Sequence, residues 1–167
     1  MEDSLLTIIT LVITWKWGDW KHWKQYYSTI LFWALGNLIY LYLTFDKPLW
    51  EFTTIIPQPL ADLLMSLLIF PCVCLLFLPH FPNKKIVKKL LYIGLWVFLF
   101  SFVELWALQI HHFAYANGWK FLYSVIFNMG MFTLLQIHYK EPRWAWIISL
   151  IAGVSIMIIF KIPLNHK

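Results

Sequence analysis

Long apolar stretches alternate along this sequence with short segments that carry charges and prolines. Because the hydrocarbon core of a bilayer is about 30 Å thick, one helical crossing needs roughly 20 mostly apolar residues. Cutting the chain where charges and prolines cluster predicts helices over residues 4–17, 26–45, 57–79, 87–110, 119–138 and 144–162. The pattern therefore predicts an all-α, polytopic transmembrane bundle of about six helices, in a single domain over residues 1–167.

The first of these helices has the shortest apolar run. Residues Leu5 to Trp17 span only about 20 Å and need flanking residues to cross a bilayer. A re-entrant segment or one that lies on the membrane surface is the alternative. The start Met1-Glu2-Asp3 lacks the positive charges of a cleaved signal peptide, so we expect this segment to be retained.

Pro71 lies in the middle of the third predicted helix. A proline there has no N–H to donate and clashes with the preceding turn, so it predicts a kink near Ser66 and Leu67. The kink serves either the packing of this helix or a hinge.

The composition agrees with lipid as the solvent. Hydrophobic residues make up 61% of the chain and charged residues 13%, against averages of about 45–50% and 25% in soluble domains. The 11 tryptophans are typical of rings that anchor helix ends at the level of the headgroups. The basic residues form short runs between apolar stretches, so the net charge of +5 indicates membrane topology and not nucleic-acid binding.

Positive charges are unevenly divided between the two sets of loops. One set holds Lys16, Lys21, Lys24, Lys84, Lys85, Lys88, Lys89, Lys140 and Arg143, and the other holds Lys47, Lys120, Lys161 and Lys167. Because positive loops stay in the cytoplasm, six crossings predict extracytoplasmic termini and cytoplasmic loops near residues 20, 85 and 141. If the first segment does not cross, only the N-terminus changes sides.

The first cytoplasmic loop combines aromatic and basic side chains, which are Trp15, Trp17, Trp20, Trp23, Lys16, Lys21 and Lys24. Anionic headgroups attract such a segment by about 1 kcal/mol per lysine near the surface. We expect these residues to anchor the chain to the lipid bilayer. Docking of a partner protein is the alternative.

Four polar side chains on four predicted helices converge on one depth in the outer half of the membrane. At 1.5 Å per residue, Asp62 lies about 7 Å deep, Glu104 about 9 Å, and Asn37 and Asn128 about 12–14 Å. Ionisable groups at such depths are costly and indicate a functional site.

Helical spacing extends this cluster along the fourth helix, where Ser101, Glu104 and His111 share one face. The candidate ligand-binding residues are therefore Asn37, Asp62, Ser101, Glu104, His111 and Asn128. Three roles stay open for them: interhelical hydrogen bonds that hold the bundle together, an outward-facing pocket for a small molecule, ion or lipid headgroup, and catalysis by a carboxylate.

Other chemistry has weaker support. His111 and His112 point about 100° apart on a helix and match no zinc motif, and Cys72 and Cys74 project from different sides of their helix. We therefore expect no metal and no cofactor.

A small transporter or transporter accessory subunit is one alternative function, although the chain has no internal repeat. A membrane enzyme acting on lipid is the other, with Ser101 one turn from Glu104 as its nucleophile.

Three stretches carry a further pattern. They are QYYSTILFWALGNLIYLYLT at residues 25–44, LADLLMSLLIFPCVCLLFLPHFP at 60–82, and residues 91–146 with ELWALQIHHFAYANGWKFLYSVIFNMGMF and HYKEPRWAW. This pattern resembles a family of small, functionally uncharacterised membrane proteins of spore-forming Firmicutes. The resemblance implies a polytopic protein in the cell membrane of a Gram-positive bacterium, and it implies no activity. It also implies a departure near Gln58, where the family pattern has His.

Overall fold

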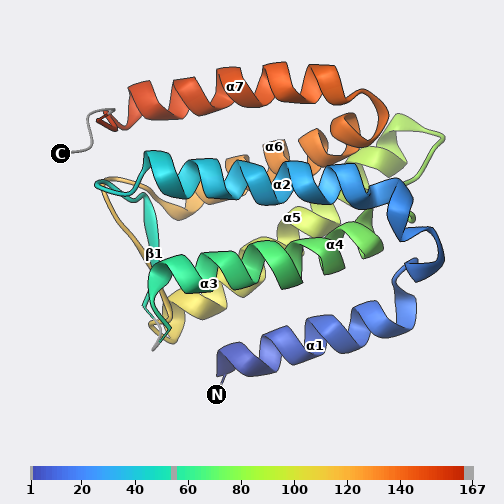
Figure 1. The fold of residues 1–167 in the computed structure, drawn as a ribbon, viewed down its shortest axis with the longest axis horizontal. Helices are drawn as coiled ribbons and strands as arrows, with labels where there is room; N and C mark the ends of the chain where they lie inside the picture. Colours follow the sequence, from blue (N-terminus) through green and yellow to red (C-terminus); the bar gives the residue numbers. More distant parts are fainter. Residues whose placement is uncertain (1, 54–55, 164–167) are drawn as a thin grey trace.

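A computed structural model of the chain describes residues 2–53 and 56–163, with side chains from residue 7 onward (Figure 1). It is a bundle of six helices, so the predicted fold class is confirmed. Five of them are α1 (Glu2–Trp17), α2 (Trp23–Leu43), α5 (Ile86–Gln109), α6 (Phe121–Lys140) and α7 (Pro142–Ile159). The remaining helix is continuous but has three parts, α3 (Gln58–Leu64), η2 (Met65–Ile69) and α4 (Phe70–Phe77). A single 3₁₀ turn, η1 (Trp20–His22), joins α1 to α2.

Four of these helices are long and apolar enough to cross a membrane. They are Gln58–Phe77, Ile86–Gln109, Phe121–Lys140 and Pro142–Ile159. The apolar part of α1, Thr7–Trp17, is shorter. Helix α2 is not among these four helices. Its 21 residues are long enough to cross a bilayer, but its tyrosines and Asn37 lower its mean hydropathy.

Successive helices run in opposite directions, so the connections gather at two ends of the bundle (Figure 1). At one end lie the start of α1, the end of α7 and the loops 44–53 and 110–120; we call this the sheet end, because it carries two short strands. At the other lie η1, the loop 78–85 and the α6–α7 corner at Glu141; we call this the basic end. The basic residues predicted to be cytoplasmic thus belong to one end of the molecule.

Aromatic side chains form much of the core between α2, α4, α5 and α6. Phe77 and Phe132 are fully buried, and their ring centroids lie 5.1 Å apart. Trp33 stacks on Phe70 at 4.1 Å with an interplanar angle of 4°. By contrast, only 6% of the apolar window of α7 is buried, as expected for a helix that faces lipid.

Before Pro71, where the sequence predicts a kink, the helix contains the π-helical turn η2. The N–H of Phe70 donates to the carbonyl of Met65, five residues earlier. A π turn accommodates the ladder where the proline removes a donor, and such turns are frequent at functional sites.

The sequence did not predict the two-stranded antiparallel sheet. Strand β1 (Trp50–Phe52) pairs with β2 (Phe113–Tyr115), and Trp50 lies opposite Tyr115. Strands of three residues are too short to show an alternating pattern. The turn after β2 is closed by the N–H of Trp119, which donates to Ala116, and its central Asn117 and Gly118 have positive φ angles. Asn and Gly tolerate that conformation well.

Candidate functional site

The first polar cluster surrounds Asp62, which is 3% exposed. The amide of Gln58 donates to Asp62 Oδ2 at 2.9 Å, one helical turn away. The hydroxyl of Ser66 donates to the Asp62 carbonyl at 2.8 Å and accepts from Asn37 Nδ2 at 3.1 Å. This network ties α2 to α3 and to the π turn, and it satisfies polar groups that lipid would leave unpaired.

Gln58 also connects this cluster to the sheet. Its Oε1 accepts from the N–H of Phe52, while its Nε2 donates to Asp62. Both ends of one amide are therefore fixed, between a backbone strand and a buried carboxyl group.

The second polar cluster surrounds Glu104 on α5. The hydroxyl of Tyr115 donates to Glu104 Oε1 at 2.8 Å, and Ser124 and Asn128 of α6 lie close to this carboxyl group. The indole of Trp119 donates to Ser124 Oγ at 2.8 Å. Burial, together with the neighbouring Glu104, raises the pKa of the Tyr115 phenol, so this side chain stays a donor at neutral pH.

Trp50 connects the two clusters. Its ring stacks on Tyr40 at 4.2 Å with an interplanar angle of 9°, and it lies 5.1 Å from the ring of Trp119. The Tyr40 hydroxyl accepts from the N–H of Leu49, which fixes the start of the strand. The sheet is thus held between α2 and the turn that precedes α6.

A groove of about 250 Å³ opens beside this sheet. Its aromatic and polar walls include Tyr40, Phe45, Trp50, Phe52, Glu51 and Gln58. Glu51 contributes a carboxylate to the groove, and no lysine or arginine among the described residues lines the groove. Lys47 is close to the groove in sequence, but its ammonium is directed to the end of α7, where it donates to the carbonyls of Phe160 and Lys161.

The structure brings the predicted site residues together in two pairs. Asn37 lies beside the carboxyl group of Asp62, and Asn128 lies beside that of Glu104. Ser101 is buried, but its hydroxyl has no hydrogen-bond partner among the described residues. The His111 side chain is exposed, at a residue with φ of 59° just beyond α5, and its carbonyl accepts from Thr53.

The sequence analysis did not predict several polar and aromatic residues of the site. Gln58 could have been found, because it precedes Asp62 by four residues on the same helix. Tyr115 and Trp50 could not, because only the pairing of two loops places them beside the helices.

Metal ligation has no support in residues 7–53 and 56–163. No group of three or more His, Cys, Asp or Glu side chains among them could hold a metal ion. Cys72 and Cys74 are free and buried, as expected for small packing residues.

The predicted anchoring residues lie at the basic end. Trp15 is 82% exposed, and the Lys16 ammonium lies 4.7 Å from the ring centroid of Trp17. Asp19 accepts from the hydroxyl of Tyr26 at 2.8 Å and contacts the His22 ring at 2.9 Å. Of the predicted anchors, Trp20 also holds the end of α1, since its indole donates to the carbonyl of Thr14 at 2.8 Å.

Comparisons with family models, with curated proteins and with solved structures give no match. The resemblance to a Firmicutes family therefore stays a prediction. The length and composition of four helices in the described part of the chain indicate a multi-pass membrane protein.

Proposed function

We propose that this chain is an integral plasma-membrane protein that binds a small, positively charged organic molecule in the groove at its sheet end. The proposal takes all six helices as crossings, so that the sheet end and both termini are extracytoplasmic. The collection of basic residues at the opposite end supports this orientation.

The lining of the groove favours a cation. Aromatic rings attract positive charge through their negative faces, and Tyr40, Phe45 and Phe52 contribute such rings. Glu51 adds a carboxylate at the rim. A compact organic cation matches this combination better than an anion or a neutral sugar.

The position of Gln58 between the groove and Asp62 is the observation that carries the proposal. Gln58 lines the groove, and its amide is held by the buried carboxyl group of Asp62. The carboxyl group thus lies one side chain behind the groove wall. The carboxyl oxygen that accepts from Gln58 would stabilise a cation that reaches this amide, because electrostatic interactions are strong in a medium of low dielectric.

Choline and its uncharged isostere 3,3-dimethylbutan-1-ol test the charge requirement. Isothermal titration of the purified protein in nanodiscs should detect choline and give at least about tenfold weaker binding of the isostere, since a desolvated cation–π contact is worth about 2 kcal/mol or more. Equal binding of the two compounds, or binding of neither, would overturn the proposal.

The variants Glu51→Gln and Gln58→Leu should weaken choline binding, whereas Gln109→Leu at the end of α5 serves as the matched control. If Asp62→Asn lowers the stability of the bundle while choline binding is unchanged, the polar cluster acts in helix packing alone, and the role of Asp62 in binding is lost.

A small transporter or transporter accessory subunit is the second candidate function, and the π turn η2 favours it. This turn lies between Asp62 and Pro71 and contains Ser66, which bonds to Asn37 on α2. A helix that can shift there would couple the polar cluster to movement of α4. Uptake of radiolabelled choline into proteoliposomes distinguishes transport from binding.

A further inference from the structure

Four lysines lie close together at the basic end, where the loop 78–85 leads into α5. The first turn of α5 contains no acidic residue, and no Asp or Glu occurs in the sequence from residue 63 to residue 103. We call these four residues the lysine cluster; they are Lys84, Lys85, Lys88 and Lys89.

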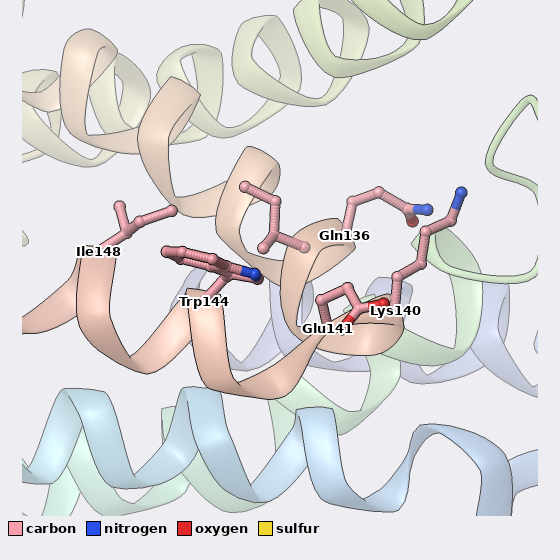
Figure 2. A pocket seen from close by; sticks show the side chains of 6 residues that line it. Gln136, Lys140, Glu141, Trp144 and Ile148 are labelled. Atoms are coloured by element: carbon pink, nitrogen blue, oxygen red, sulfur yellow. The ribbon is translucent and has the colours of Figure 1, made fainter.

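The charge of this cluster is not balanced by the protein. Its ammonium groups have no ion-pair or hydrogen-bond partner in the part of the chain that the structure describes. Every other basic residue of this end lies within five residues of Asp19 or Glu141 in the sequence. Figure 2 shows one of them, Lys140, directly before Glu141 at the end of α6, where both line a crevice of about 330 Å³.

The fold also brings these like charges close to one another. The N–H groups of Lys88 and Lys89 both donate to the carbonyl of Lys85, so these three lysines belong to one helical turn. Positive side chains three or four residues apart on a helix repel each other. An anion placed among them would relieve this repulsion.

Exposed apolar side chains alternate with the lysines and indicate where that anion comes from. Ile86, Val87, Leu90 and Leu91 are between 61% and 69% exposed. Because the candidate span of α5 begins at Ile86, Lys88 and Lys89 lie at the edge of the hydrocarbon, and their long side chains reach the headgroups. A soluble acidic protein or a nucleic acid would have to enter the bilayer to reach them, whereas a phospholipid is already there.

We propose that the lysine cluster binds an anionic phospholipid, with its phosphate among Lys85, Lys88 and Lys89. One acyl chain lies against Leu90 and Leu91. Clusters of four or more lysines next to a membrane-spanning helix are typical of such binding. The site is independent of the groove at the sheet end, so either proposal can fail without the other.

Native mass spectrometry of the wild-type protein, released from nanodiscs of equal parts phosphatidylglycerol and phosphatidylcholine, tests the headgroup. Both lipids contain a phosphate, but only phosphatidylglycerol has a net negative charge. We expect phosphatidylglycerol to be retained at least about tenfold over phosphatidylcholine, because each lysine near an anionic surface contributes about fivefold. Equal retention of the two lipids would overturn the proposal.

Paired substitutions then locate the lipid. The double variant Lys88→Gln with Lys89→Gln should lower the preference for phosphatidylglycerol by at least about tenfold. The double variant Lys21→Gln with Lys24→Gln removes the same charge from the same end and should leave the preference nearly unchanged. Equal losses in the two double variants would mean a general attraction to the basic end and would refute the site.

Thermal unfolding gives a second measurement. In phosphatidylcholine alone, the variant at residues 88 and 89 should be at least as stable as the wild type, because a repulsion between like charges has been removed. Adding phosphatidylglycerol should raise the Tm of the wild type and not that of this variant. The same rise in both proteins would contradict binding at the lysine cluster.

Discussion

The two ends of the bundle use the same residue types in opposite ways. At the sheet end, Trp50 is stacked on Tyr40, and Asp62 is 3% exposed within a network of hydrogen bonds. At the basic end, Trp15 is 82% exposed, and the Asp19 side chain is 24% exposed. The comparison teaches that a tryptophan or an aspartate predicts little by itself, because its burial decides whether it holds the fold or faces the membrane surface.

Replacing one tryptophan at each end gives the largest expected contrast. Trp50→Ala should lower the free energy of unfolding by about 3 kcal/mol, because it removes the ring that packs between α2 and the turn before α6. Trp15→Ala should change it by less than about 0.5 kcal/mol, as is usual at exposed positions. Denaturation in detergent micelles, followed by circular dichroism, measures both values. Equal effects would mean that the sheet end is no better packed than the basic end.

Removing the Asp62 carboxyl group should have the next largest effect. Asp62→Ala leaves the amide of Gln58 without its acceptor, and we expect a loss of about 1–3 kcal/mol. Asp62→Asn retains an acceptor and should cost less. If the two variants are equally stable, hydrogen bonding by this side chain does not hold α3 in place.

The buried polar pair of the basic end provides a smaller test. The Thr29 hydroxyl and His138 Nδ1 lie 3.0 Å apart, and the His138 ring stacks on Phe32 at 4.2 Å. Thr29→Val keeps the shape but removes this hydrogen bond, so stability should fall by about 1 kcal/mol, within the range found for interhelical bonds in membranes. Ser155→Ala is the control, because the Ser155 hydroxyl donates to the carbonyl of Ile151 within its own helix. A similar loss in both variants would contradict a specific contribution from the pair.

The smallest effect concerns pH at the basic end. The hydrogen bond from Tyr26 and the contact with His22 lower the pKa of Asp19 below its ordinary value of 3.8. A carboxyl group with a lowered pKa stabilises the folded state above its unfolded pKa and loses that contribution as the pH falls through the folded value. Unfolding measured from about pH 6 down to about pH 2 should therefore show a small acid loss that Asp19→Asn lacks. The same acid profile in the variant would assign this loss to other carboxyl groups.

The helices could be predicted almost completely from the sequence. Each predicted segment has a counterpart whose ends differ by a few residues, and a π turn lies before Pro71, where the sequence predicts a kink. Apolar runs of about 20 residues can form little else in lipid, because every backbone group must be bonded internally.

The candidate site could be predicted only in part. The depth argument predicts one cluster of Asn37, Asp62, Glu104 and Asn128, whereas the structure groups them in two clusters, one around Asp62 and one around Glu104. The connection between these clusters runs through Trp50 and Tyr115, in loops whose pairing has no local pattern.

The sequence by itself determined the number of helices, their order and the separation of charge between the two ends, because these follow from local composition and from the thickness of a bilayer. Only the tertiary structure decided which polar side chains meet, that a small sheet closes one end, and that the side-chain oxygen of Gln136 is buried without a hydrogen-bond partner among the described residues. Such features depend on residues far apart in the chain, such as Trp50 and Tyr115. Local hydrophobicity contains no information about which of those distant residues will pack together.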